Sequence, residues 1–119
     1  MPYIPKERRM AIDYNSTVPK TAGELNYYAT TAILRGTLKD VFDFQVMIDA
    51  WIKEVGLSYQ TINDMAGVAL NVPAEFMRRG HYDAYKTRLH NLATAYGLFY
   101  SSVVARYEND KVRDNGDVF

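Results

Sequence analysis

Residues 82–113, YDAYKTRLHNLATAYGLFYSSVVARYENDKVR, decide the fold of this chain. Apolar side chains recur there at alternating steps of four and three residues, which is the spacing of one face of an α-helix. A second apolar stripe runs beside the first, so we expect this helix to be buried on two faces. The first stripe is Tyr85, Leu89, Leu92, Tyr96, Phe99 and Val103, and the second is Ala93, Gly97, Tyr100, Val104 and Tyr107.

The predicted helix is long for so small a protein. At about 1.5 Å per residue it would measure roughly 48 Å. A globular chain of 119 residues has a radius of gyration of only ~13 to 14 Å. One end of the helix would therefore project from a monomer unless another subunit covered it, and we expect the protein to be a homo-oligomer.

Two further helices are predicted upstream from start and stop signals. The first spans about 22–35, because Thr21 and Glu24 have the spacing of a capping box and Gly36 fits the end. The second spans about 38–55, because residues 37–40 repeat the same start signal. The apolar residues that define its buried stripe are Leu38, Val41, Phe44, Ile48, Trp51, Ile52 and Val55.

A third upstream helix is predicted to start after Gly56, with Ser58 as its N-cap. It extends to residues 71–72, and Pro73 either kinks it or opens the next helix at its first turn. Its predicted apolar face consists of Tyr59, Ile62, Ala66, Ala69 and Leu70.

The first 20 residues have a different character. Pro2, Pro5 and Pro19 interrupt helical runs, and residues 13–16 are turn-forming, which predicts an extended arm with a short turn. No useful strand-like alternation occurs anywhere. We therefore predict an all-α single domain over residues 1–119, a small helical bundle (21–119) with one long C-terminal helix and an irregular N-terminal arm (1–20).

Composition excludes several classes of protein. Fourteen basic and fourteen acidic residues give a formal net charge of zero, which argues against non-specific binding of nucleic acid or of an anionic membrane. The absence of cysteine excludes disulfides and thiol chemistry. The N-terminal MPYIPKERR has no apolar core, and no stretch is apolar enough to span a membrane. We expect a cytoplasmic protein with no membrane partner.

Paired cations and ten tyrosines mark the candidate ligand site. Arginine forks suit phosphate, and a tyrosine ring can stack on a nucleobase. The alternative is that the arginines stabilise a helix C-terminus and the tyrosines pack in the core or at an interface. The candidate ligand-binding residues are Arg78, Arg79, Tyr82, Tyr85, Lys86 and Arg88.

Carboxylates raise a second possibility, a Mg²⁺ site formed by Glu75, Glu108, Asp110 and Asp114. The spacing is not specific, because Glu108 with Lys111 also fits a surface ion pair. The Glu-Glu-x-x-Glu run of all-α nucleotide pyrophosphohydrolases is absent. We therefore assign no catalytic residue, no metal ligand and no cofactor from the sequence.

Several blocks of the chain resemble a family of short uncharacterised proteins from bacteriophages and bacteria, which begin with MPYI and end in a YE-x-x-K-x-x-x-NGDVY-like tail. The C-terminal block, residues 107–119, is the most specific. The resemblance implies a phage or prophage source but no activity. The other matching blocks are 1–5, Gly23–Tyr27, Ser58 to Val68 and Glu75 to Arg79.

Together these observations favour a phage-encoded, non-catalytic, small oligomeric helical protein that binds a nucleotide-like ligand and sequesters a signal of host defence. One alternative is an interaction or virion-associated protein that binds a host protein and no small molecule. The other is a Mg²⁺-dependent nucleotide hydrolase.

Overall fold

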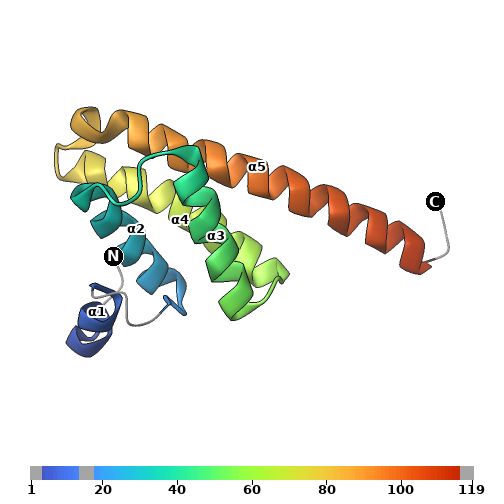
Figure 1. Ribbon diagram of the computed structural model, residues 1–119. Helices are drawn as coiled ribbons and strands as arrows, with labels where there is room; N and C mark the ends of the chain where they lie inside the picture. The colour runs from blue at the N-terminus through green and yellow to red at the C-terminus, as the bar shows by residue number, and fades with distance from the viewer. Residues whose placement is uncertain (1–3, 14–17, 116–119) are drawn as a thin grey trace.

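Two antiparallel helices form the base of the fold in a computed structural model (Figure 1), which describes residues 4–13 and 18–115 and, for 104 and 107–115, the backbone alone. They are α4, Tyr59–Arg78, and α5, Tyr82–Asn115. Helix α3, Val41–Val55, packs against α5, and α2, Ala22–Arg35, packs against α4. The short α1, Lys6–Asp13, packs on α2. The predicted all-α bundle with a long C-terminal helix is confirmed.

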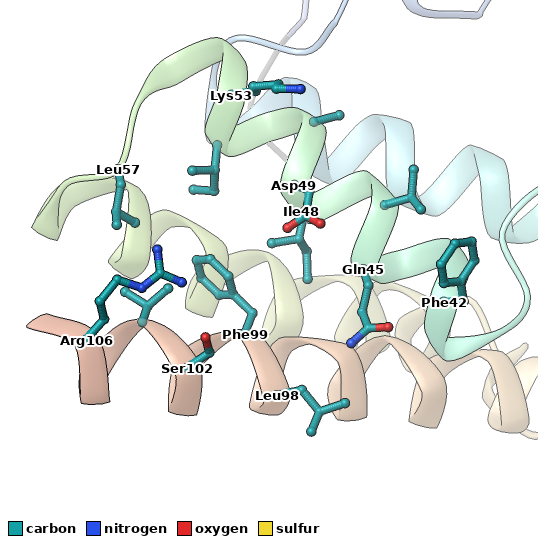
Figure 2. A pocket seen from close by; sticks show the side chains of 14 residues that line it. Phe42, Gln45, Ile48, Asp49, Lys53, Leu57, Leu98, Phe99, Ser102 and Arg106 are labelled. Atoms are coloured by element: carbon teal, nitrogen blue, oxygen red, sulfur yellow. The ribbon is translucent and has the colours of Figure 1, made fainter.

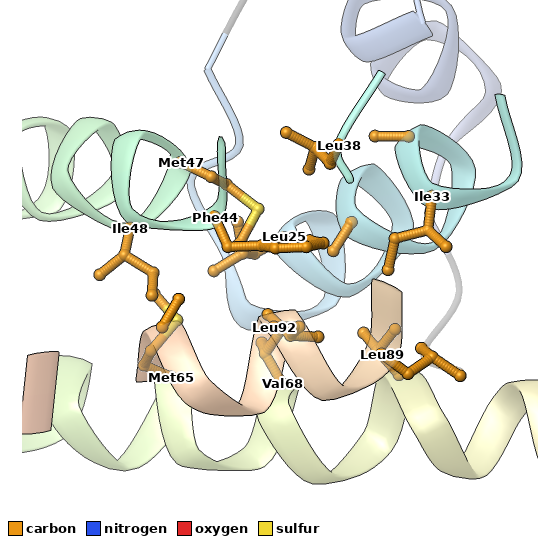
Figure 3. Packing of buried hydrophobic residues seen from close by; sticks show 14 of the residues in the cluster. Leu25, Ile33, Leu38, Phe44, Met47, Ile48, Met65, Val68, Leu89 and Leu92 are labelled. Carbon is orange, nitrogen blue, oxygen red and sulfur yellow. The ribbon is translucent and has the colours of Figure 1, made fainter. Parts of the chain in front are cut away.

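A single apolar cluster lies where α2, α3, α4 and α5 meet (Figure 3). Leu89 and Leu92 of α5 are fully buried, and Tyr85, Tyr96 and Phe99 pack against the cluster, so the first predicted stripe of α5 faces the core. The largest side chains in this cluster are Trp51, Phe44, Phe76, Leu25, Ile33, Ile48 and Met65.

Helix α2 begins and ends where the sequence predicts. The Thr21 hydroxyl accepts a hydrogen bond from the backbone N–H of Glu24 at 3.1 Å, and Gly36 closes the helix with φ of 81°. Helix α3, in contrast, begins at Val41 rather than near residue 38. The reason is that Thr37 belongs to the end of α2, where its hydroxyl donates to the carbonyl of Ala32 at 3.2 Å.

Helix α4 differs from its prediction in two ways. It runs through Pro73 to Arg78, so it does not end at residues 71–72 and the proline does not open a new helix. Its predicted apolar face was also wrong, because Tyr59 and Leu70 are exposed. The buried face is instead offset around the helix, and its apolar members are Met65, Val68, Val72 and Phe76.

The N-terminal arm contains a helix that the sequence analysis did not predict. An isolated eight-residue helix is marginal in water, and tertiary contacts hold α1 in place. Ile12 is buried, the Arg8 guanidinium forms an ion pair with Glu24, and the Tyr27 hydroxyl donates to Asp13 at 2.9 Å. The predicted turn at 13–16 lies mainly outside the described residues.

The C-terminal part of α5 extends beyond the other helices (Figure 1). Its 34 residues correspond to about 51 Å at 1.5 Å per residue. The radius of gyration is 15.6 Å, above the ~13.5 Å expected for a compact chain of this length. Over the described residues, no helix combines the length and the apolar character needed to cross a bilayer.

Candidate functional site

The two arginines at the end of α4 are engaged within their own helix. The Arg78 guanidinium pairs with the Glu75 carboxylate, and the Nε of Arg79 donates to Glu75 Oε1 at 3.1 Å. Glu75 is 8% exposed, and the hydrogen bond from Arg78 is the main cause that holds its pKa below the usual value. Arg78 and Arg79 therefore balance a nearly buried carboxylate at the C-terminal end of α4, where cations are also favoured by the helix dipole.

Tyr82 and Lys86, two other predicted residues, have different surroundings. The Tyr82 hydroxyl lies 3.3 Å from Nε2 of His90, so it interacts along α5. Lys86 is exposed on α5 and does not line the hollow described below. Of the six predicted residues, Tyr85 and Arg88 line that hollow.

Tyr85 and Arg88 do lie together, at the corner between α5 and the end of α2. The Tyr85 ring packs against Phe76 with ring centroids 5.1 Å apart, and the Arg88 guanidinium carbon lies 5.5 Å from the centre of the Tyr85 ring. One terminal nitrogen of Arg88 donates to the carbonyl of Ile33 at 2.9 Å. Tyr85 and Ile33 therefore hold Arg88 in one position, while its other N–H donors remain for further partners.

A shallow hollow of about 520 Å³ opens beside Arg88. It is lined by three cationic side chains, Arg35, Lys39 and Arg88, and by no carboxylate. Lys39 and Arg88 converge over Gly36. A Cβ atom at that glycine would lie 3.5 Å from Lys39 Cε and 4.0 Å from both terminal nitrogens of Arg88. Sequence analysis missed Arg35 and Lys39, because no local signal places them near a residue about 50 positions away.

The chain around this hollow is arranged so that it does not repel an anion. The end of α2 would present free carbonyl oxygens, but the carbonyl of Ile33 accepts from Gly36 N and from Arg88, and that of Ala32 accepts from Thr37 N at 2.9 Å. The first turn of α5 contributes Ala84 and Tyr85 to the wall, and a helix N-terminus carries a positive dipole end. Arg35 also lies 3.5 Å from Asp13, so its charge is partly balanced.

The predicted magnesium ligands give a different result. Glu75 is held by two arginines, and the side chains of Glu108, Asp110 and Asp114 lie outside the described residues. Within the part of the chain that the structure describes, no three carboxylate or imidazole side chains gather as a metal site would need.

A larger hollow of about 860 Å³ lies between α3 and the C-terminal half of α5 (Figure 2), and we call it the α3–α5 groove. Its apolar lining includes Phe42, Val46, Leu57 and Leu98, each of them about half exposed or more. Sequence analysis did not predict this groove, since Phe42, Val46 and Asp49 of its α3 wall lie outside the predicted apolar stripe of that helix.

Comparison with protein families identifies the chain. Residues 1–118 match the family described as Domain of unknown function (DUF6899). The chain belongs to this family. This agrees with the uncharacterised family indicated by the sequence blocks, and the description of the family states no activity. No curated protein and no solved structure matches the chain.

Proposed function

We propose that this DUF6899 protein is a non-catalytic binding protein for a phosphorylated, nucleotide-like small molecule. The binding site is the hollow between α2 and α5, with Lys39 and Arg88 as the phosphate-binding residues and Tyr85 as a positioning residue for Arg88. The supporting observation is the convergence of Lys39 and Arg88 over Gly36 in a hollow without a carboxylate.

The energetics favour an anion there. Lys39 and Arg88 carry like charges close together, so they repel each other. A phosphate bound between them attracts both and offsets this repulsion. Arginine offers a planar fork for two phosphate oxygens, and lysine adds a point charge. A volume of about 520 Å³ lies within the ~300–1,000 Å³ of small-molecule sites.

The phage resemblance adds a finer proposal about biological role. In a phage-infected cell, a small protein that binds a nucleotide tightly and leaves it unchanged would remove a signal of host defence from solution. This part of the proposal depends on the sequence blocks at 1–5 and 107–119 and on the anion site together.

Native mass spectrometry and isothermal titration calorimetry test the site with ATP, ADP, AMP and pyrophosphate as probes. We expect Lys39→Gln and Arg88→Gln each to weaken binding by about tenfold or more, because each removes a charge-assisted hydrogen bond to phosphate. Lys20→Gln, an exposed lysine remote from the hollow, is the matched control. Lys86→Gln distinguishes this site from the site predicted by sequence. Because Lys86 lies outside the hollow, this substitution should leave nucleotide binding unchanged.

Two results would overturn the proposal. One is a wild-type protein that binds none of the four probes at millimolar concentration. The other is a bound nucleotide that is released in altered form after denaturation, which would instead support the hydrolase.

A second candidate function is protein–protein interaction without a small ligand. The α3–α5 groove supports it, because contiguous exposed apolar side chains mark interaction surfaces. If the nucleotide probes fail and a host protein binds this chain but not its Phe42→Ala variant, this candidate replaces the first.

A further inference from the structure

The α3–α5 groove exposes large apolar side chains on both of its walls. Phe42 of α3 is 71% exposed and Val46 is 51% exposed, while Leu98 of α5 is 52% exposed. Leu57, just beyond α3, closes one end of the groove (Figure 2). Each such side chain costs ~25 cal/mol per Å² of apolar surface left in water, so covering the groove is favourable.

We propose that a second copy of this chain occupies the groove, in a twofold-symmetric dimer in which α5 of each copy lies along α3 of the other. A twofold interface must be self-complementary. Each copy offers a hollow along α3 and an exposed ridge on α5. The exposed residues of that ridge are small or apolar, namely Leu98, Ser101, Ser102 and Ala105. This inference goes beyond the proposed ligand site and uses none of its residues.

Charge complementarity favours the same occupant. Asp49 of α3 and Arg106 of α5 both line the groove and face into it (Figure 2). Neither forms an ion pair with another described side chain. In an antiparallel twofold dimer, Asp49 lies opposite Arg106 of the partner subunit, and the symmetry repeats the pair. Lys53 also lines the groove, with its side chain pointing away from α5 (Figure 2). Glu54 is exposed on the same helix and does not line the groove.

Charge reversal tests both the surface and the symmetry. The dimer is measured by sedimentation equilibrium, and circular dichroism checks that each variant keeps its helical content. Asp49→Arg would place two arginines against each other at each of the two pairs, and Arg106→Asp would do the same with aspartates. Because like charges in an interface are strongly unfavourable, we expect each variant alone to raise the dimer dissociation constant by about tenfold or more.

Mixing the two variants gives the decisive measurement. A heterodimer of Asp49→Arg with Arg106→Asp restores an opposite-charge pair at both positions, so we expect the mixture to form heterodimers with near wild-type affinity. Glu54→Arg, an acid-to-base reversal on α3 outside the groove lining, is the matched control and should leave the dimer intact. Interfaces of standard size have dissociation constants of roughly μM to pM, so a wild-type protein that stays monomeric at about 0.1 mM would overturn the proposal.

A wild-type dimer that both charge variants leave unchanged would also overturn it, because the interface would then lie elsewhere. Neither result would affect the nucleotide titrations, which depend on Lys39 and Arg88, two residues that do not line the groove. The two proposals can therefore fail separately.

Discussion

Replacing Thr30 with valine should stabilise the protein. Thr30 is 2% exposed on α2, and its hydroxyl has no hydrogen-bond partner in the described structure. An unpaired buried polar group costs about 1–3 kcal/mol. Valine has nearly the shape of threonine and a similar helix propensity, so Thr30→Val removes the hydroxyl without opening a cavity. We expect the free energy of unfolding to rise by about 1 kcal/mol or more.

Thr61→Val is the matched control, since the same substitution should have the opposite effect there. Thr61 is also buried, but its hydroxyl accepts from the backbone N–H of Ser58 at 2.8 Å and donates to the Ser58 carbonyl at 2.9 Å. Removing the hydroxyl leaves the N–H at the start of α4 without its acceptor. Loss of such a cap costs ~1–2 kcal/mol.

Urea unfolding followed by circular dichroism measures both changes. The midpoint should rise for Thr30→Val and fall for Thr61→Val at unchanged slope, since neither substitution alters the surface exposed on unfolding. In a thermal melt, 1 kcal/mol corresponds to about 3–6 °C for a chain of this size. If Thr30→Val destabilises the protein as much as Thr61→Val does, then the Thr30 hydroxyl has a bonded partner and the reasoning fails.

Two further predictions concern the N-terminal helix and the glycines. The Arg8 guanidinium lowers the pKa of Glu24 in the folded protein. The pair therefore stabilises the fold fully at pH values above about 4.3, the pKa of glutamate in an unfolded chain. This contribution is lost as the pH falls through the lowered pKa of the folded state. Glu24→Gln should therefore lower the melting temperature at neutral pH and match wild type near pH 2; an equal gap at both would contradict this. Gly36→Ala should destabilise by about 1 kcal/mol, because φ there is 81°. Gly97→Ala should stabilise the monomer by up to ~1 kcal/mol, because a Cβ there meets nothing within 4 Å. Unfolding curves measure both glycine variants, and midpoints that shift in the same direction would contradict these two predictions.

Local chemistry explains which helices were predictable. The limits of α2 follow from Thr21 and Gly36, which act within one turn of the chain, and the structure confirms both. The buried face of α4 was not predictable in the same way. Two apolar stripes compete on that helix, and packing against α2 and α5 decides in favour of the one with Phe76. The helix α1 was missed because its contacts with Glu24 and Tyr27 come from another element.

The candidate site also shows that local sequence does not predict contacts between distant elements. Sequence proximity grouped Arg78 and Arg79 with Tyr85, yet a carboxylate three residues before Arg78 takes up both arginines. The neighbour that matters for Arg88 is Lys39, and only the packing of α2 against α5 brings the two over Gly36. Tyrosine and arginine content directed attention to this part of the chain, but it could not show which cations another side chain already pairs with.

The two proposed surfaces lie on different parts of α5, and this separation shapes how each proposal can be tested. From Arg88 to Leu98 the helix rises by about 15 Å, and the two hollows share no lining residue. Substitutions that far apart, with no shared partners, act nearly additively. A change in nucleotide affinity on Asp49→Arg would therefore require a coupling between the two hollows, carried either through α5 or through the short segment from Lys39 of the proposed phosphate site to Phe42 of the groove.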